Sequence, residues 1–161
     1  MKRITVYFIS LLLLMTFLNG CSQDDDSRTD LFQYKNSYVG DSSAVGNIVK
    51  QLAHSEELNQ ISLETQNEPY GITLEYKDID AERLDDEMQE TVIANSTFLF
   101  ALIKNVDWII FKFPDQEFSV TKEKVEDWYN TNLDAIDNEQ DLKSLIQKQL
   151  NAEESVHPLF S

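Results

Sequence analysis

The sequence predicts an α+β fold, in which an antiparallel sheet of about four strands carries helices packed on one face. Two observations lead to this class. Segments that alternate between apolar and polar residues, or that are rich in β-formers, occur in two pairs, each joined by a short turn, which indicates two hairpins. Segments with apolar residues at helical spacing stand before, between and after these pairs. Because the strands of the first pair each have one polar face, we expect the helices to cover only the opposite face of the sheet.

The first helix and the first hairpin follow each other in the chain. Asp41 or Ser42 is suited to cap the N-terminus of the helix, and an apolar stripe follows at helical spacing over residues 45–52. The hairpin is predicted over residues 61–77, around a turn at 67–71 that contains proline and glycine.

The longest helix is predicted over residues 84–105, after a polar linker at 78–83. Acidic residues occupy its first turns, where they stabilise the helix dipole. Its second half, residues 97–103, is apolar nearly all round, which a surface helix does not need. That half is therefore either the central helix of the core or a surface that covers a partner.

The second hairpin and two further helices are predicted in the last third of the chain. Residues 106–113 are apolar on both faces, as in an interior strand, and residues 118–120 form a short returning strand. Thr121 is suited to cap the next helix, and a last helix is predicted to start at Asp137 or Asn138.

The first 21 residues have the plan of a secretory signal, with a positive head, an apolar run over residues 4–18 and a small residue before the cut. The end of this segment, Leu18-Asn19-Gly20-Cys21, resembles the bacterial lipoprotein signal box. The resemblance implies cleavage after Gly20 and attachment of lipid, with fatty acids such as palmitate, to Cys21. The alternative is an uncleaved transmembrane anchor, although the apolar run is shorter than the roughly 20 residues that a spanning helix needs.

This interpretation divides the chain into a signal peptide at residues 1–20, a lipidated cysteine with an acidic tether at 21–30, and a single domain at 31–161. The tail of the domain, from Ala152, is expected to be frayed. The protein would then be anchored at the extracytoplasmic face of the cell membrane. Cys21 is the only cysteine in the chain, so no disulfide can form within it.

The acidic composition limits the classes of partner. The chain carries 29 acidic and 13 basic side chains, which gives a formal net charge of −16 at pH 7. Such a surface repels nucleic acid and anionic lipid head groups, so neither is expected as a partner. It is compatible with a basic protein, with a cell-envelope component or with bound cations, and equally with a solvated acidic surface that binds nothing.

No arrangement of residues in the sequence points to catalysis, to a metal site or to a cofactor. The two histidines, His54 and His157, are far apart and lie outside any metal-binding or catalytic motif. Carboxylate pairs are frequent because acidic residues are frequent, so they carry no specific sign of acid–base chemistry. We therefore predict no enzyme activity, no catalytic residue, no metal ligand and no cofactor.

Two loops are candidates for a binding site. One contains Tyr38 and Asp41, and the other contains Tyr70 and Gly71. Both loops combine an aromatic ring with a glycine, which lets a backbone approach closely. The alternative is local, because the glycines can shape a cap and a turn and the tyrosines can pack on the core. As a site, the four residues are expected to lie near one surface.

These residues belong to a wider pattern that resembles a known family. Tyr38-Val39-Gly40-Asp41, then Leu63-Glu64-Thr65-Gln66, and Pro69-Tyr70-Gly71 ahead of a strand are similar to a domain of unknown function. That family occurs in Gram-positive lipoproteins and beside membrane-embedded peptidases of the antibiotic-sensing type. The resemblance covers residues 31–115. It implies the location and the unity of the domain, and it implies no activity.

These features together predict a membrane-anchored extracytoplasmic lipoprotein that serves as a non-enzymatic binding or accessory module. The alternatives are a small-molecule or cation sensor of the same fold and, with the least support, a hydrolase. A basic partner and a small ligand differ in their signature. Binding of a basic partner falls steeply with salt, whereas a small ligand raises the melting temperature of the protein at any salt concentration.

Overall fold

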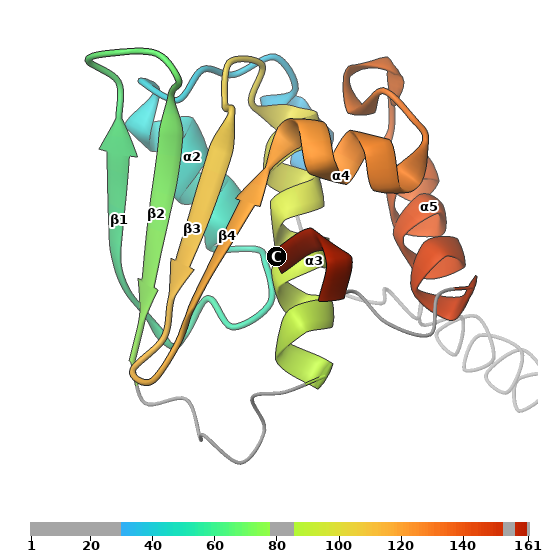
Figure 1. Cartoon of the computed structure of the whole chain (residues 1–161). Coiled ribbons are helices and arrows are strands. Elements are labelled where there is room, and N and C mark those ends of the chain that lie inside the picture. The colour runs from blue at the N-terminus through green and yellow to red at the C-terminus, as the bar shows by residue number, and fades with distance from the viewer. Residues whose placement is uncertain (1–29, 78–85, 153–156, 161) are drawn as a thin grey trace, which may run out of the picture.

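The computed structural model describes residues 30–77, 86–152 and 157–160. The α+β class is confirmed, because a four-stranded sheet packs against helices (Figure 1). The strands are β1 (Leu58–Glu64), β2 (Gly71–Tyr76), β3 (Trp108–Lys112) and β4 (Glu117–Thr121). The α-helices are α2 (Ser42–Val49), α3 (Asp86–Leu102), α4 (Lys122–Tyr129) and α5 (Glu139–Ala152), and the short 3-10 helices are η1 (Leu31–Tyr34), η3 (Leu133–Ala135) and η4 (His157–Phe160).

The strand order in the sheet is β1-β2-β3-β4. The pairs β1–β2 and β3–β4 are antiparallel hairpins, as expected, whereas β2 and β3 run parallel. The parallel pair arises because α3 lies between β2 and β3 in the chain and returns it to the end of the sheet where β2 begins (Figure 1). The order of elements along the sequence does not reveal at which end of the sheet β3 starts.

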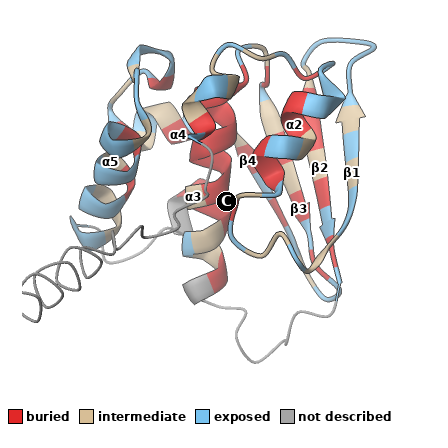
Figure 2. Cartoon of the chain, turned by 180° about the vertical axis from the view of Figure 1, so that it is seen from behind, coloured by how far each residue is buried: buried red, intermediate tan, exposed pale blue. Residues whose placement is uncertain are grey.

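The helices lie on one face of the sheet, as the polar faces of the first hairpin predicted. α2 and α3 cover that face, and α4 and α5 continue beyond the β4 side (Figures 1 and 2). Within the described ranges no helix lies over the opposite face, which we call the outer face (Figure 1). By strand register and the alternation of side chains, its residues are Gln60, Ser62, Glu64, Gly71, Thr73, Glu75, Trp108, Ile110, Lys112, Glu117, Ser119 and Thr121.

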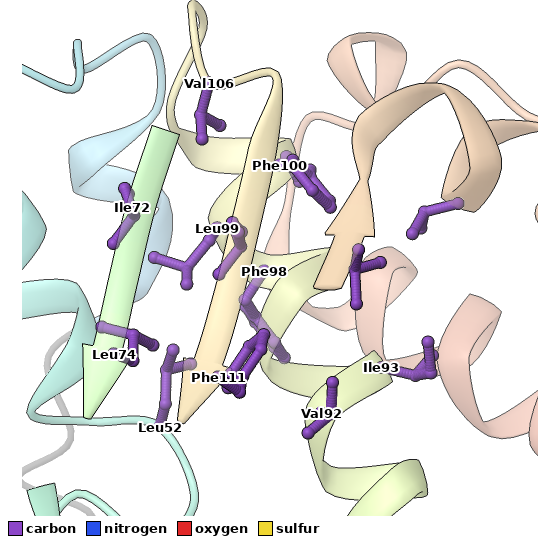
Figure 3. Packing of buried hydrophobic residues seen from close by; sticks show 14 of the residues in the cluster. Leu52, Ile72, Leu74, Val92, Ile93, Phe98, Leu99, Phe100, Val106 and Phe111 are labelled. Atoms are coloured by element: carbon purple, nitrogen blue, oxygen red, sulfur yellow. The ribbon is translucent and has the colours of Figure 1, made fainter. Parts of the chain in front are cut away.

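The second half of α3 is the centre of the core. Every residue from Asn95 to Ile103 is buried, which confirms the expectation of a central core helix (Figure 2). Leu99 lies beside Ile72 and Leu74 of β2 (Figure 3), and α4, α5, η1 and η3 also contact α3. A helix enclosed in this way needs apolar residues nearly all round.

Polar residues within this buried stretch form hydrogen bonds. Asn95 Nδ2 donates to the carbonyl oxygen of Ala53 at 3.0 Å. Thr97 Oγ1 donates to the carbonyl oxygen of Ile93 at 2.7 Å and lies 3.1 Å from the hydroxyl of Tyr129. Burial raises the pKa of Tyr129 to about 12, because its phenolate would lose hydration.

Side-chain caps fix the starts of three helices. Asp41 and Thr121 cap α2 and α4 by accepting a backbone N–H three residues further on. Asn138, rather than Asp137, accepts in the same way at the start of α5. Residues 78–85, on which the predicted linker and the predicted start of the longest helix fall, lie outside the described residues.

The expectation of a frayed tail from Ala152 is wrong for residues 157–160. These residues form η4, in which Leu159 is buried. The ring of Phe160 stands edge-on to the ring of Phe118 on β4, with 4.9 Å between the centroids. The tail is therefore ordered by an aromatic partner that is distant in sequence and gives no local signal.

Candidate functional site

The first predicted loop presents an aromatic ring to solvent. Tyr38 is 53% exposed as a whole residue. Asp41 is exposed as well, but its Oδ1 atom accepts the N–H of Ala44 at 3.0 Å and so caps α2. Tyr38 is therefore available to a partner, whereas the carboxylate of Asp41 already has a structural role.

The second predicted loop is joined to the start of β3. Tyr70 is half-buried against the core, and its carbonyl oxygen accepts the N–H of Asp107 at 2.8 Å. The N–H of Tyr70 in turn donates to Oδ2 of Asp107 at 2.8 Å. Gly71 is buried and is the first residue of β2. Both predicted residues thus have partners within the fold.

The connection between α3 and β3 holds the two loops at one end of the sheet. The backbone N–H of Lys104 donates to the carbonyl oxygen of Ser37 at 2.8 Å. The side-chain oxygen of Asn105 accepts the backbone N–H of Val39, also at 2.8 Å. The connection then reaches Asp107, which bonds to Tyr70. The two loops that contain the four predicted residues are therefore both hydrogen-bonded to the connection between α3 and β3.

Trp108 is the most distinctive side chain at this end. It is paired directly with Gly71 across the parallel β2–β3 strands. A Cβ atom added to Gly71 would lie under 3.0 Å from three bonded atoms of the indole, at nearly equal distances, so the ring lies flat over the Gly71 backbone. The indole Nε1 donates to the carbonyl oxygen of Pro69 at 3.0 Å. A residue without a side chain is needed at position 71 because the ring occupies that space.

One face of the indole is covered by Gly71, and the other points away from the sheet. Trp108 and Ile110 are both half-buried on the outer face, over which no described helix lies (Figure 1). Their neighbours on this face offer hydroxyl or carboxylate groups: Ser62, Glu64, Thr73, Ser119 and Thr121. A fixed aromatic ring among hydrogen-bonding groups has the composition of a recognition surface.

Trp108 is not among the residues that the sequence pattern pointed to. A signal for it was nevertheless present, because residues 106–113 are apolar on both faces while helices were expected on one face only. An apolar side chain on an uncovered sheet face contributes little to the core. The conflict between those two expectations could have identified Trp108 as a candidate.

A second hollow lies on the helical side of the molecule. It is a cavity of about 200 Å³ between the end of α2, the middle of α3 and the start of α5, and Leu52, Phe98, Glu139 and Lys143 belong to its lining. Burial alone would raise the pKa of Glu139, but its hydrogen bonds with Lys143 and with the N–H of Leu31 outweigh burial and hold it below the usual value. The ion pair of Glu139 and Lys143 thus forms part of the cavity lining, and the Glu139 carboxylate also accepts the N–H of Leu31 at the start of the domain.

The other residues considered in the sequence do not form a site in the described ranges. Cys21 and the signal segment lie outside the described residues. The part of the chain that is described contains no helix long and apolar enough to cross a membrane. His54 Nδ1 lies 3.6 Å from Oε1 of Glu57. Residues 30–77, 86–152 and 157–160 contain no group of three or more histidine, cysteine or acidic residues that could hold a metal ion.

Comparison with known families identifies the domain. A family model described as Domain of unknown function (DUF4825) matches residues 31–125, which is more than half of the 161 residues. The chain belongs to the DUF4825 family. The search of the curated proteins and the search of the solved structures each returned no match.

The DUF4825 match contains the sheet, α2, α3, both predicted loops and Trp108, and it ends at Val125 within α4. It thus extends beyond Asp115, where the resemblance in the sequence ended. α5 and η4 lie outside the DUF4825 match, although α5 contacts α3 and η4 contacts β4. The outer face is therefore a feature of the DUF4825 region itself.

Proposed function

We propose that this DUF4825 protein is a membrane-anchored extracytoplasmic lipoprotein whose domain binds a partner and performs no catalysis. The observation that carries the proposal is the indole ring of Trp108, which is fixed flat on the outer face over Gly71. In this proposal the binding surface is the outer face around Trp108.

The fixed position of the ring supports a binding role. Because Pro69 accepts from Nε1 and Gly71 underlies the ring, the indole of Trp108 has little rotational freedom to lose when a partner binds. Tryptophan is also among the residues that contribute most to binding energy in protein interfaces.

The topology of the sheet supports the same surface. Parallel strands are usually covered on both faces, whereas the outer face of the parallel β2–β3 pair is open in the described part of the chain. A partner that covers this pair would complete the environment that parallel strands usually have.

The sequence of the N-terminal segment supports the anchoring. The segment from Met1 to Cys21 has the pattern of a lipoprotein signal, and residues 22–30 are polar. Nine flexible residues have an r.m.s. reach of roughly 15–18 Å, so the domain would stay close to the membrane surface. Two acyl chains on one lipidated cysteine supply the two signals that stable anchoring needs.

A small-molecule sensor is the second candidate, and the cavity between α2, α3 and α5 favours it. Its volume of about 200 Å³ is below the roughly 300–1,000 Å³ of most ligand pockets. It could therefore take only a small ligand, and a ligand of this kind would raise the melting temperature independently of salt. A hydrolase has less support, because the sequence contains no nucleophile motif and His54 Nδ1 lies 3.6 Å from Oε1 of Glu57.

Site-specific photo-crosslinking in the intact cell tests the binding surface. A photoreactive residue replaces Ser119 on the outer face in one variant and Ser144 on α5 in the other; both serines are exposed. We expect the Ser119 variant to form a covalent adduct with a partner, the Ser144 variant to form none, and Trp108→Leu to reduce the yield at position 119. Equal adducts at both positions, or none at position 119, would rule out the outer face as the binding surface.

Cell fractionation of Cys21→Ala tests the anchoring. Without the lipid the protein should accumulate as uncleaved precursor or leave the membrane fraction, since residues 22–30 offer no other apolar anchor. Processed Cys21→Ala protein that stays with the membrane after an alkaline salt wash would contradict the lipid anchor.

A further inference from the structure

We infer that Trp108 and Glu64 form a docking site for an arginine or lysine side chain on a basic segment of a partner protein. This inference rests on the proposed function, in which the outer face is the binding surface. It adds the chemistry of the partner to that surface.

The indole of Trp108 offers only its π-face to a partner. Its single polar hydrogen is used by the carbonyl of Pro69, and one of its faces is covered by Gly71. The free face carries the negative potential of the ring quadrupole, which attracts a cation placed over it. An arginine guanidinium also stacks on such a face through its own plane.

Glu64 places a carboxylate next to this ring. Glu64 is the partner of Gly71 across β1 and β2, and the indole lies over Gly71. Neighbouring strands are about 4.8 Å apart, so the exposed Glu64 side chain and the ring are close on the same face. Oε1 of Glu64 accepts the N–H of Gln66 at 3.2 Å, and no basic side chain of the described residues pairs with the carboxylate.

The charge balance of the outer face favours a cationic partner. The face carries the carboxylates of Glu64, Glu75 and Glu117 against one basic side chain, Lys112, which pairs with Glu117 at 3.7 Å. The whole chain has a formal net charge of −16. A second copy of the chain would therefore be repelled, whereas a basic segment is attracted by the ring and by the carboxylate together.

Arginine and its neutral analogue citrulline separate this chemistry from other modes of binding. The probe is a peptide with three arginines spaced by glycines, and the matched probe carries citrulline at the same positions. In the full chain with Trp128→Phe, Trp108 is the only tryptophan, and its fluorescence reports binding at the site directly. We expect the arginine peptide to change this fluorescence and to bind at least about threefold more tightly than the citrulline peptide.

Two glutamate variants separate the site from the general charge of the protein. Glu64→Gln removes the carboxylate beside the ring, and Glu56→Gln removes an equal charge just before β1. β1, which separates the two positions, is about 20 Å long, well beyond the screening length of about 8 Å at physiological salt. We expect Glu64→Gln to weaken binding of the arginine peptide about threefold and Glu56→Gln to leave it unchanged. In calorimetry, Trp108→Leu should weaken it about three- to tenfold.

The outcomes distinguish this inference from the proposed function. If Glu64→Gln and Glu56→Gln lose equal affinity for the arginine peptide, the peptide is attracted only by the net charge of the protein, and the inference is overturned. Equal binding of the citrulline peptide, or a stronger response to chitotriose as a neutral sugar probe, would also overturn it. In each of these cases the crosslinked adduct at position 119 would still support the outer face as a binding surface. Loss of that adduct would overturn the proposed function as well.

Discussion

Gly71 has a negative φ angle, so its missing side chain serves the ring of Trp108 rather than the conformation of the turn. The sequence pattern had identified Gly71 as a place where something comes close to the backbone. The structure identifies what comes close, namely a side chain of the same domain. Glycine is thus required at position 71 because of a side chain on the neighbouring strand β3.

Gly71→Ala should lower the free energy of unfolding by about 1–3 kcal/mol, because the new methyl group would overlap the indole. Urea denaturation measures this. Gly46→Ala in α2 is the control, since a Cβ atom there meets no atom within 4 Å, and it should be neutral or stabilise by up to about 1 kcal/mol. Similar losses in the two variants would contradict the close approach of Trp108 to Gly71.

Tyr129 gives a prediction of pH dependence. Burial raises its pKa from the ordinary tyrosine value of 10.0 to about 12 in the folded protein, so the unfolded chain loses its proton first. The contribution of Tyr129 to stability is complete below about pH 10 and is lost as the pH rises to about 12, by up to about 2–3 kcal/mol. Urea midpoints between about pH 9 and 12 should fall less in Tyr129→Phe than in Tyr38→Phe. Equal slopes would show that Tyr129 is not protected by burial.

At the scale of elements, Lys35 joins the N-terminal segment to η3. Its Nζ atom donates to the carbonyl oxygens of Ile136 at 2.7 Å and Asp134 at 3.2 Å. Burial lowers the pKa of Lys35, although the nearby carboxylate of Asp134 acts in the opposite direction. One ammonium group thus holds together segments that lie at opposite ends of the domain sequence.

Lys35→Met should lower the free energy of unfolding by about 1.5–3 kcal/mol, because it removes hydrogen bonds from a charged donor to partly buried carbonyls. Lys50→Met at the end of α2 removes the same charge from an exposed position and should change it by less than about 0.5 kcal/mol. Chemical denaturation of the two variants measures both changes in the free energy of unfolding. A small effect of Lys35→Met would mean that η3 is held by apolar packing alone.

The elements that depend on local signals could be predicted from the sequence. Asp41 and Thr121 cap helices where expected, and the apolar stripe of the first helix is buried. The parallel pairing, η4 and the contact of Trp108 with Gly71 could not be predicted, because each depends on a contact with a distant segment. The two loops that contain the four predicted site residues are bonded to the same connection, between α3 and β3. Their sequence neighbourhoods do not reveal that Gly71 lies under an indole ring.

At the scale of the whole molecule, the core extends beyond the DUF4825 match. Leu133, Leu142, Ile146 and Leu159 are buried in the same apolar cluster as α3 and the sheet, yet all lie after Val125. The segment after the match therefore covers part of the central helix.

A chain of residues 31–125 should expose the apolar side of α3 and lose cooperative unfolding, whereas a chain of residues 31–161 should unfold in one transition. Circular dichroism and binding of a hydrophobic dye distinguish the two chains. Cooperative unfolding of the shorter chain at full stability would show that the family region folds without its C-terminal cover. Two transitions in the longer chain would contradict a single domain.

β1 is one of the two edge strands of the sheet, and in the described part of the chain no backbone hydrogen bond joins the edge of β1 that faces away from β2 to another segment. Free strand edges are templates for self-association, and proteins oppose this with charge, bulges or proline. β1 has a bulge only near Leu58 and one acidic residue, Glu64. The main protection is then the repulsion between strongly acidic molecules, which disappears near the isoelectric point of about 4.3. We therefore expect the protein to self-associate through the free edge of β1 near pH 4.3, where this repulsion is lost.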